Sequence, residues 1–566
     1  MRRKPRRRPV EAHSTLAAIY LPAQGDAPVL STMMDRPLLL DDLLERAAIE
    51  FGDIEIVSQR PDKTLHRYTY ADMAARAKRL AAALTHAGIE AGNRVATLSW
   101  NHYAHLEAYF GIPAMGGVCH MVNIRLAPDD IAWIINHAGD RVLIVDDVLL
   151  PLYRKFADAI DVERVIVVPL TGEPVPDDLL DYESFLAEAP DDFVYPEKSE
   201  YDACGMCYTS GTTGRPKGVI YSHRSTVLHA LTGALPDNLD LSYNDSVLPV
   251  VPMFHVNAWG LPYIATMVGA KQVFPGPHLD AESLLDLYVA ENVNISAGVP
   301  TIWMAILNAL DTEPRRWSLR SDLQMIVGGS AAPESMLRRF DDHGLTVIQA
   351  WGMTETSPLG TTGRLKPAIQ AMDEDTQYAK RATVGTTVPL VHIRIVDADG
   401  NIAPRDGESM GELQIRGPWI AGSYYRLDNS EEKFTADGWL RTGDIATIDA
   451  HGYIDITDRT KDVIKSGGEW ISSVHLENEI MGHPDVAEAA VIARADERWG
   501  ERPLAAVVPR AGADLSPEAL REFLLERMPK WMVPEDFVIV EAIPRTATGK
   551  FSKRDLRQQL GHDKSA

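Results

Sequence analysis

The stretch from Thr209 to Gly218 reads TSGTTGRPKG, and the rest of the chain is best understood from it. It combines glycines, hydroxyl side chains and two cations, and apolar residues flank it in 201–208 and 219–221. Backbone N–H groups exposed by glycines, with hydroxyls and a lysine, are what a polyphosphate needs. It is not a Walker P-loop, because Pro216 rather than Gly precedes Lys217. We predict a phosphate-binding loop held between two anchored segments, with a plain surface loop as the alternative.

The composition limits the classes of protein that the chain can belong to. With 566 residues it is too long for one hydrophobic core, which predicts at least two domains. The net charge of −24 argues against a general nucleic-acid binder. No run of 18 apolar residues occurs, so no transmembrane helix is expected. We expect a cytoplasmic protein, with peripheral attachment to a membrane as an open alternative.

The three cysteines are too few for a disulfide framework. Cys204 and Cys207 have CxxC spacing, but a second pair that would complete a zinc site is missing. We therefore interpret Cys204 and Cys207 as small apolar residues of the strand before the phosphate loop, with a redox role as the alternative. Cysteines of this kind fit a reducing cytoplasm.

The N-terminus is strongly basic, since the first eight residues hold six cations. The apolar residues that follow, from Leu16 to Leu21, are too short a run for a signal-peptide core. We expect residues 1–33 to form a disordered basic tail, and Met33 or Met34 to be an alternative start.

From about residue 38 the hydrophobic pattern predicts an α/β fold. A helix is expected over 71–87, where apolar residues recur at spacings of three and four and Gly88 stops them. Strands are expected at 94–98, 141–145 and 164–168, and the helices between them imply parallel pairing. Further strands are expected at 295–299, 323–327 and 347–351, while Pro249 leaves the strand ends open in the apolar run 247–251. The glycine-rich segment 388–456 suits a small β-barrel. A compact C-terminal domain is predicted from strands at 487–492, 505–508 and 537–540 and a helix at 517–528.

Two further segments carry residue types that suit a nucleotide. Gly328 and Gly329 follow a strand, where missing side chains let a ligand approach the backbone. The next strand ends in Trp351, Gly-Met, Thr354 and Glu355. An aromatic face can stack on adenine, a threonine can bind phosphate, and a carboxylate can hold Mg²⁺ that is bound to phosphate oxygens.

At several positions the residues alone leave a structural alternative open. The alternatives are a core side chain for His255 and Trp259, a turn residue for Asp444, a solvated connector for 458–462, a plain turn for 466–471 and a solvated tip for Lys550.

The phosphate loop Thr209–Gly218 resembles that of the adenylate-forming superfamily, which includes acyl-CoA synthetases, luciferases and peptide-synthetase adenylation domains. The resemblance runs from about Arg36 to Lys553. It is strongest to medium- and long-chain fatty-acyl-CoA synthetases, including the branch that acts on methylmercaptopropionate.

The resemblance implies a domain organisation. A large N-terminal adenylation domain at 34–457 would contain two α/β sheet subdomains and the small β-barrel. A hinge at 458–462 would connect it to a small mobile α+β domain at 463–566, with Lys461 as the residue that absorbs the backbone rotation.

The resemblance also implies site residues. Lys550 would be the lysine that swings over the active site, and His255 would lie between the carboxylate and the α-phosphate. Glu355 would bind Mg²⁺, with Thr209 as a further ligand. The residues implied for ATP and AMP are Thr209, Ser210, Gly211, Thr212, Thr213, Gly214, Lys217, Gly329, Ser330, Ala331, Trp351, Gly352, Thr354, Asp444, Arg459 and Lys550. Asp444 would accept the ribose hydroxyls.

The remaining implied residues concern the acyl group and coenzyme A. Trp259 matches an indole that gates the acyl tunnel of long-chain synthetases. Gly467, Gly468, Glu469 and Trp470 match the loop that lines the pantetheine tunnel. Trp351 stands where many relatives have Tyr, and Ala350 where many have Gly; these departures concern the depth of the acyl pocket.

The reaction implied is the ATP-dependent activation of a medium- or long-chain fatty acid as acyl-AMP, with release of pyrophosphate and transfer of the acyl group to coenzyme A. ATP, Mg²⁺ and coenzyme A are the expected cofactor and substrates, and a homodimer is expected. Alternatives are a 3-methylmercaptopropionate–CoA ligase and an acyl-AMP ligase that does not use coenzyme A. A luciferase-type oxygenase, a peptide-synthetase adenylation domain and a regulatory protein that has lost catalysis are further alternatives.

Overall fold

The computed structural model describes residues 31–190, 192–209, 215–427, 432–466, 469–496, 498–510, 512–545 and 551–560, and only the backbone of 469 and 470. The chain divides into a short unit, Met1–Pro37, and a large compact unit, Leu38–Ala566. The described part of the short unit, 31–37, is without helix or strand. The tail predicted for 1–33 lies almost wholly outside the described residues.

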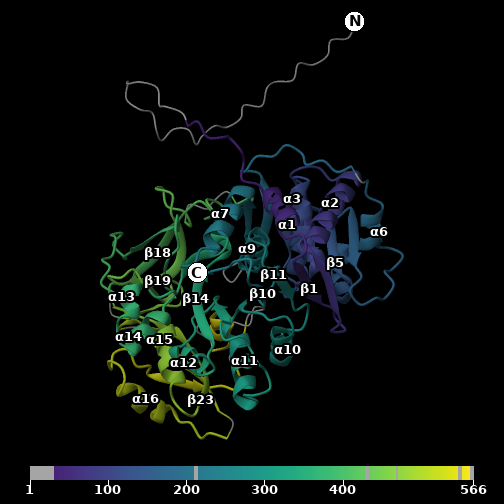
Figure 1. Cartoon of the computed structure of the whole chain (residues 1–566). Coiled ribbons are helices and arrows are strands. Elements are labelled where there is room, and N and C mark those ends of the chain that lie inside the picture. Colours follow the sequence, from purple (N-terminus) through teal and green to yellow (C-terminus); the bar gives the residue numbers. More distant parts are fainter. Residues whose placement is uncertain are drawn as a thin grey trace, which may run out of the picture. The chain divides into compact units, whose positions relative to one another are not determined.

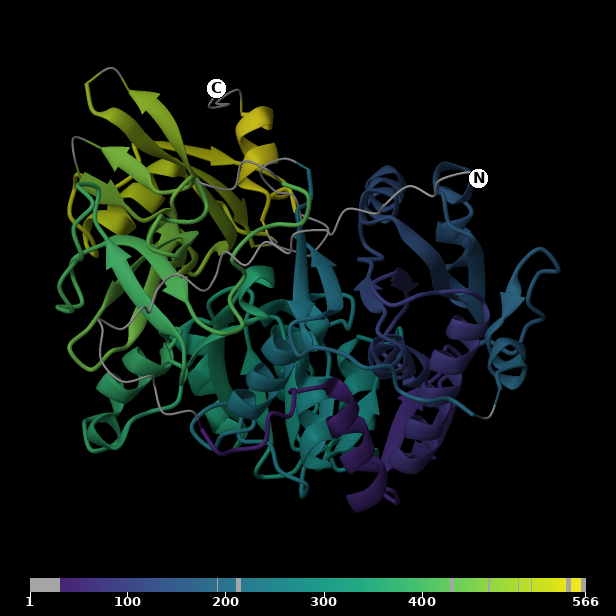
Figure 2. The same ribbon diagram turned by 90° about the horizontal axis from the view of Figure 1, so that it is seen from above.

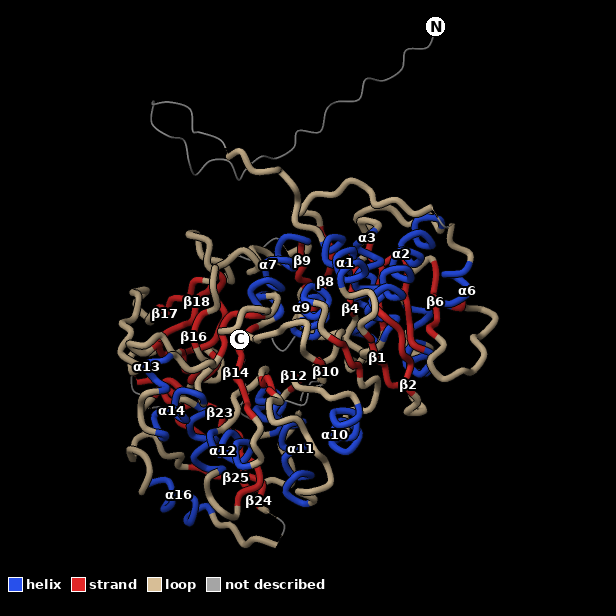
Figure 3. Tube along the Cα trace, in the orientation of Figure 1, coloured by secondary structure: helices blue, strands red, loops and turns tan. Residues whose placement is uncertain are grey.

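Within the described ranges, the strands of the large unit form four sheets (Figure 3). The first is parallel except for its last pair, β8 and β9, which is antiparallel. In spatial order its strands are β7 (Leu180–Asp181), β6 (Arg164–Val168), β5 (Asp140–Asp146), β3 (Arg94–Leu98), β4 (Val118–Met121), β8 (Ala203–Tyr208) and β9 (Gly218–Ser222). The predicted parallel pairing of the strands at 94–98, 141–145 and 164–168 is confirmed.

The second sheet has a parallel centre with antiparallel pairs at both ends. In spatial order its strands are β16 (Thr386–Thr387), β15 (Leu359–Thr362), β14 (Thr346–Gly352), β13 (Gln324–Val327), β12 (Ile295–Gly298), β10 (Ser246–Pro249), β11 (Lys271–Phe274), β1 (Glu55–Gln59) and β2 (Leu65–Thr69). The strands before Gly328 and Glu355 are therefore neighbours, β13 and β14, so their carboxyl ends meet at one edge.

Helices cover both large sheets. The segment predicted as a helix at 71–87 is α2, which opens with a capping box between Thr69 and Asp72. Helix α3 contacts β1 of the second sheet and β3, β4 and β8 of the first, so it lies between the two sheets. Figure 1 shows α1, α2 and α3 gathered beside β1 and β5. The helices of this part are α1 (Leu40–Glu50), α2 (Tyr70–His86), α3 (Tyr103–Ala114), α4 (Pro128–Ala138), α5 (Leu150–Tyr153), α6 (Tyr182–Ala187), α7 (His223–Gly233), α8 (Val256–Trp259), α9 (Leu261–Val268), α10 (Ala281–Ala290), α11 (Pro300–Thr312), α12 (Glu334–Asp342), α13 (Pro367–Gln370) and α14 (Glu374–Arg381).

The segment expected to form a small β-barrel is an antiparallel sheet with β17 and β20 at its edges. Its strands are β17 (His392–Val396), β18 (Gly411–Arg416), β19 (Leu440–Ile448) and β20 (Ile454–Arg459). Trp351 of β14 and Leu359 of β15 pack into the core beneath it, which joins this sheet to the second one.

The C-terminal part is an α+β unit, as predicted. Its strands are β21 (Ile464–Ser466), β22 (Glu469–Ile471), β23 (Val486–Asp496), β24 (Gly500–Pro509) and β25 (Asp536–Ile539), and its helices are α15 (Ser473–Met481), α16 (Pro517–Leu525) and α17 (Lys553–Gln559). Helix α15 contacts β20, so the C-terminal part adjoins the antiparallel sheet (Figure 2). Among the described residues, no helix has the length and apolar character needed to cross a membrane.

Candidate active site

The predicted phosphate loop connects β8 to β9, and the structure describes its two ends. Tyr208 pairs with Gly218 in the antiparallel ladder. The Thr209 N–H donates to the Lys217 carbonyl over 2.9 Å, and the Lys217 N–H donates to Thr209 Oγ1 over 3.1 Å. The loop is therefore closed at its base by a strand pair, as the flanking apolar segments predicted. The residues between, Ser210, Gly211, Thr212, Thr213 and Gly214, lie outside the described residues.

Glu355, the predicted magnesium ligand, lies in the 3₁₀ turn η3 (Thr354–Thr356) and is almost completely buried. Its Oε1 accepts a hydrogen bond of 2.6 Å from the Tyr424 hydroxyl. The Lys217 ammonium lies 5.0 Å from the centroid of the same Tyr424 ring. Tyr424 therefore brings the lysine of the phosphate loop and the candidate metal ligand to one place.

The short segment that contains Tyr424 is held on both sides of the site. The Ala421 N–H donates to the Glu355 carbonyl over 2.7 Å, and the Tyr425 N–H donates to the Gly218 carbonyl over 2.9 Å. A Cβ at Gly218 would lie 3.2 Å from Tyr425 Cβ, so glycine leaves room for this close approach of the Tyr425 segment. The sequence analysis missed this segment. Its only local signal is the pair of adjacent tyrosines that follows Gly-Ser.

The chemistry of these groups fits a magnesium ion bound together with ATP. Among the described residues, no group of three His, Cys, Asp or Glu side chains is placed to hold a metal ion. Mg²⁺ usually takes one or two carboxylates and completes its shell with substrate phosphate oxygens and water. A buried carboxylate such as Glu355 beside a phosphate loop supplies this arrangement. Burial and the Glu355 carboxylate raise the pKa of Tyr424, so its hydroxyl remains a donor that orients Glu355.

Asp444, the predicted ribose ligand, lies within β19 and is 1% exposed. Its Oδ2 accepts from the Trp351 indole N–H over 3.0 Å, and Arg459 Nε lies 2.6 Å from its Oδ1. Asp444 and Arg459 are direct partners in the β19–β20 ladder. The structure thus brings together three predicted nucleotide residues, and Asp444 is a strand residue.

Trp351 packs more deeply than an adenine platform requires. It is 9% exposed, and its ring lies against Gly360, where a Cβ would come within 2.7 Å of Cζ3. Gly352 is equally confined, since a Cβ there would lie 1.7 Å from the Pro358 carbonyl oxygen. The Thr354 carbonyl accepts from the Tyr221 hydroxyl over 2.8 Å. Tyr221 belongs to β9, so the end of β14 is tied directly to the strand that follows the phosphate loop.

Hydrogen bonds of Gln349 hold the glycine turn that follows β13. Gln349 Oε1 accepts from the Ala332 N–H over 3.0 Å, and its Nε2 donates to the Ala382 carbonyl over 2.6 Å. Gly329 has a φ of 84°, which favours glycine. Ser330 and Ala331 are exposed at this edge of the sheet, where the resemblance places the adenine.

His255 opens a left-handed turn. The Val256, Asn257, Ala258 and Trp259 backbones have φ values of 48°, 56°, 48° and 57°, and Gly260 continues at 77°. Such a conformation costs about 1–2 kcal/mol for each non-glycine residue, so the surroundings must hold it. Gly260 packs against the His229 ring, where a Cβ would lie 2.6 Å from Cε1, and Asn257 Oδ1 lies 3.7 Å from Cys207 Sγ.

This turn directs Trp259 to the edge of the second sheet. A Cβ at Gly328 would lie 3.0 Å from Trp259 Cη2 and 3.1 Å from the Ala350 carbonyl oxygen. The predicted gate residue, the glycine turn and the acyl-pocket residue Ala350 are therefore in contact. The sequence motif identified Trp259 but gave no signal of the left-handed backbone.

Lys461, the predicted hinge residue, lies between Thr460 and Asp462, whose side chains have hydrogen-bond partners in different parts of the molecule. Thr460 donates to the Gly443 carbonyl from its N–H over 2.8 Å and from its hydroxyl over 3.1 Å. Asp462 Oδ1 accepts from Arg557 of α17 over 2.5 Å. Thr460 is thus attached to the antiparallel sheet, while Asp462 binds the C-terminal helix through its side chain and the Arg459 carbonyl of β20 through its N–H over 2.8 Å.

Several predicted residues of the C-terminal part cannot be placed. Gly467, Gly468 and Lys550 lie outside the described residues. Glu469 and Trp470 belong to β22, which pairs with β21, but their side chains are not described.

The cysteines are structural, as predicted. Cys119, Cys204 and Cys207 are buried. Burial raises the pKa of Cys204 and of Cys207 to about 12, so both remain uncharged thiols near neutral pH.

The chain is similar to known proteins over most of its length. Over about 94% of its length the chain is 50% identical to a long-chain-fatty-acid–CoA ligase of Thermus thermophilus, covering 97% of that protein. It is 43% identical to a 3-methylmercaptopropionyl-CoA ligase of Ruegeria lacuscaerulensis, covering 94% of this chain and 99% of that protein. The solved structure of the anthranilate CoA ligase AuaEII with anthranoyl-AMP is similar at 25% identity and a TM-score of 0.80, over 93% of this chain and 98% of that one.

Family models match in both parts of the molecule. Residues 44–425 match the AMP-binding enzyme family, and residues 475–550 match the AMP-binding enzyme C-terminal domain. The first match spans most of the chain. It includes Lys217, Glu355 and Tyr424, which contact one another. The pair of Asp444 and Arg459 follows the match in the sequence. This chain belongs to the AMP-binding enzyme family.

Proposed function

We propose that this protein is an ATP-dependent acyl-CoA synthetase that activates a medium- or long-chain fatty acid as acyl-AMP and then transfers the acyl group to coenzyme A. The observation that carries the proposal is the convergence of Lys217 and Glu355 on Tyr424, residues distant in sequence. A lysine of the phosphate loop and a buried carboxylate at one point support a site for a nucleoside triphosphate with Mg²⁺. The identity to a long-chain-fatty-acid–CoA ligase supports the same activity.

The first half-reaction is the attack of a carboxylate oxygen on the α-phosphorus of ATP, with pyrophosphate leaving. A carboxylate is a poor acyl donor until this step replaces its charge with a good leaving group. The protein must orient two anions and reduce their repulsion. Mg²⁺ on Glu355 would neutralise phosphate charge, with Thr209 as a candidate second ligand.

Other residues would position the nucleotide. Asp444 would accept the ribose hydroxyls, and Arg459, which is paired with it, would contact the nucleotide. The exposed Ser330 and Ala331, with Gly329, would border the adenine, while Trp351 would support Asp444 from the protein interior. Lys550 would place its ammonium near the carboxylate and the α-phosphate, and His255 would lie beside them.

The second half-reaction is attack of the coenzyme A thiol on the carbonyl carbon of the adenylate, with AMP leaving. We assign the loop from Gly467 to Trp470 to the pantetheine tunnel by resemblance. Rotation about Lys461 would exchange this loop and Lys550 at the active site. The separate attachments of Thr460 and Asp462 support this pivot.

The acyl pocket supports an aliphatic substrate. Trp259 lies against Gly328 and Ala350, and the segment from Val251 to Gly276 is mostly apolar, with Lys271 as its fixed cation. Lys271 is paired with Glu291 over 2.8 Å, so it does not serve a second substrate carboxylate. A short thioether acid, 3-methylmercaptopropionate, is the second candidate because a ligase for it is 43% identical.

Two finer properties complete the proposal. We expect a homodimer, which sedimentation of the purified protein tests. We expect a cytoplasmic enzyme with an option of peripheral membrane attachment, which cell fractionation tests.

The deciding experiment is pyrophosphate release with ATP and Mg²⁺ across straight-chain acids from short to long and 3-methylmercaptopropionate, with and without coenzyme A. A maximum at medium or long chains that yields the CoA thioester supports the proposal. A maximum at the thioether acid selects the second candidate. Acyl-AMP that accumulates whether or not coenzyme A is present indicates an acyl-AMP ligase, and no turnover with any acid refutes the substrate class.

A further inference from the structure

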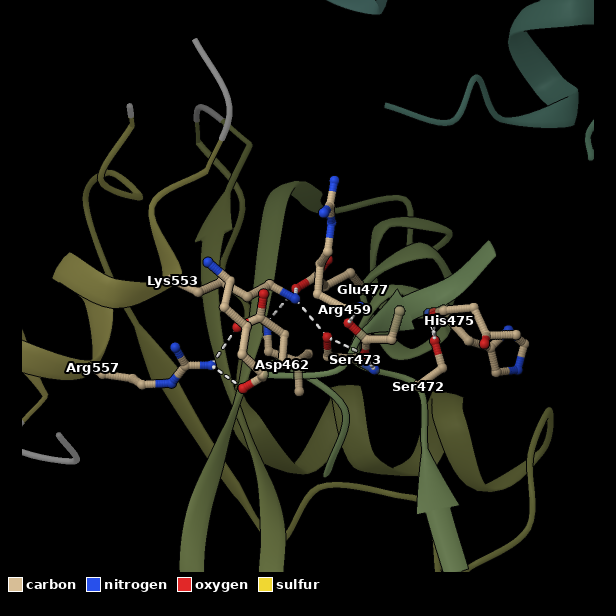
Figure 4. A network of polar contacts seen from close by, with 12 residues as sticks. Arg459, Asp462, Ser472, Ser473, His475, Glu477, Lys553 and Arg557 are labelled. Carbon is tan, nitrogen blue, oxygen red and sulfur yellow. Dashed lines mark hydrogen bonds and ion pairs between the residues drawn. The ribbon is translucent and has the colours of Figure 1, made fainter. Parts of the chain in front are cut away.

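A buried network of charged and polar side chains lies at the end of β20 (Figure 4). The Lys553 ammonium of α17 lies 2.6 Å from Glu477 Oε1 and donates to Ser473 Oγ over 2.6 Å. Asp458 Oδ2 accepts from the Ser473 N–H over 2.5 Å and from its hydroxyl over 2.6 Å. One carboxylate from β20 thus binds the first residue of α15, and Ser473 links it to Lys553, the first residue of α17.

The network crosses the proposed hinge. Asp458 precedes Lys461 and is fixed by the pairing of β20 with β19. Ser473, Glu477 and Lys553 all follow Lys461 and belong to the C-terminal part. The Ser472 hydroxyl also donates to the Thr457 carbonyl, so a second bond crosses at the same point.

The surrounding charges strengthen the contact between Asp458 and Ser473, which connects the two sides of the hinge. Asp458 is 2% exposed, and burial raises its pKa while Lys553 opposes the rise. Burial works to lower the pKa of Lys553, but Glu477 and Asp458 together raise it above its usual value. The Ser473 N–H at the start of α15 adds the positive end of the helix dipole. A carboxylate buried in this way is stable only while the partners from the C-terminal part stay in place.

We infer that Asp458 is a positioning residue that holds the C-terminal part in the orientation seen here, and that its bonds to Ser473 break when the hinge rotates. Bonds of 2.5 and 2.6 Å do not survive a displacement of the helix that supplies them. The bonds within the C-terminal part, from Lys553 to Glu477, move as one body. Asp458 therefore biases which of the two half-reactions the enzyme is set for. This inference rests on the proposed two-step reaction and on the pivot at Lys461.

The test compares Asp458→Asn with Glu477→Gln. Both changes remove one buried carboxylate charge beside Lys553, but the ion pair and the hydrogen bond that the described residues give Glu477 join it to groups that follow the hinge, Lys553 and the Val491 N–H. Adenylation is measured as acid-dependent ATP–pyrophosphate exchange without coenzyme A. Transfer is measured in a single turnover from synthetic acyl-AMP to coenzyme A. We expect Asp458→Asn to change the ratio of the two rates by about tenfold or more, because a charged hydrogen bond is lost from one orientation only.

The control variant Glu477→Gln should lose thermal stability, while its ratio of the adenylation rate to the transfer rate stays within about twofold of the parent. Ser473→Ala, which keeps the backbone N–H but removes the hydroxyl, should shift the ratio in the same direction as Asp458→Asn by a smaller factor. Ser473→Ala replaces Asp458→Asn in this comparison if Asp458→Asn does not fold. Equal loss in both half-reactions for Asp458→Asn and Ser473→Ala would overturn the inference.

A distance measurement separates this inference from the proposed reaction. Spin labels on Val194→Cys and Glu526→Cys would lie before and after the hinge in the sequence. Both positions are exposed: Val194 is 81% exposed, and 79% of the Glu526 side chain is exposed. The native cysteines are buried and should not be labelled. Asp458→Asn should add a second population of distances that Glu477→Gln lacks. One unchanged population in both variants refutes the positioning role even if catalysis is as proposed. A second population in Asp458→Asn without any acyl-adenylate formation would refute the proposed reaction and leave the positioning role standing.

Discussion

The indole N–H of Trp351 donates to the carboxylate of Asp444 over 3.0 Å, at a point where both side chains are buried. Trp351→Phe would keep the ring and remove this donor, which leaves Asp444 less well oriented for ribose. We expect the KM for ATP to rise about tenfold, the usual effect of losing a hydrogen bond to a charged group. Steady-state pyrophosphate release at varied ATP measures it.

Trp317 supplies a matched control for this substitution. Its exposure is also 9%, and its indole donates to the Asp286 carboxylate over 2.7 Å, away from the candidate site. Trp317→Phe should lower stability without changing the KM for ATP. If the two variants change KM alike, the contact with Asp444 has no special role in nucleotide binding.

Tyr424→Phe tests the orientation of Glu355. The variant keeps the ring beside Lys217 and removes the hydroxyl that donates to Glu355. We expect the Mg²⁺ concentration for half-maximal activity to rise about tenfold, because partners that orient a metal ligand typically contribute that much. Tyr425→Phe is the control, since the Tyr425 hydroxyl donates to the Ala138 carbonyl over 3.4 Å. An unchanged Mg²⁺ requirement in Tyr424→Phe would argue against Glu355 as the metal ligand.

Gly328→Ala tests the acyl pocket. The added methyl group would lie 3.0 Å from the Trp259 ring, so the ring or the turn must shift. We expect kcat/KM for long acids to fall about tenfold more than for short acids, the range that one methyl group contributes in an apolar pocket. Gly422→Ala, where a Cβ meets no atom within 4 Å, is the control. A uniform loss across chain lengths would place the acyl tunnel elsewhere.

Lys461→Pro tests the pivot. Proline fixes φ near −65° and so restricts rotation at the residue between Thr460 and Asp462. We expect adenylation to persist and transfer to coenzyme A to fall by about tenfold or more. Lys461→Ala should leave both half-reactions close to those of the parent. Equal losses in both steps of a folded Lys461→Pro variant contradict the assignment.

The thiols should be unreactive in the folded protein. Since burial raises the pKa of Cys204 and Cys207 to about 12, the thiolate is scarce at pH 8, and access is blocked as well. We expect mass spectrometry to detect no iodoacetamide adduct in native protein and adducts at all three cysteines in guanidinium chloride. Val194→Cys provides an exposed thiol that should react under the same native conditions. Rapid native labelling of Cys204 or Cys207 would revive a redox interpretation.

Local patterns predicted the parts of the fold that depend on neighbouring residues. The continuous apolar run at 164–168 matches β6, and the segments around the phosphate loop form β8 and β9. Motif composition also pointed to Glu355, and the family resemblance pointed to Asp444 and Trp259. Glu355 and Trp259 lie in short turns, whereas Asp444 lies in the middle of β19.

Contacts between distant segments were beyond such reasoning. The partner of Glu355 is 69 positions away, and its choice depends on how the antiparallel sheet packs on the second sheet. The left-handed turn at 256–259 contradicts the intrinsic preference of its residues and exists only because the surrounding core holds it. The burial of Asp458 within a charged run, for which the residues alone left a solvated connector open, likewise depends on α15 and α17.

The order in which these contacts join the chain has a consequence for protein synthesis. The hairpin of β8 and β9 can form once Ser222 has left the ribosome, but Glu355 gains its tyrosine only after residue 424 has been made. Ser473 and Lys553 are synthesised later still, so their bonds in the network around Asp458 form after the contact of Tyr424 with Glu355 has become possible. A nascent chain can therefore bring Lys217, Tyr424 and Glu355 together before the contacts that join β20 to the C-terminal part exist.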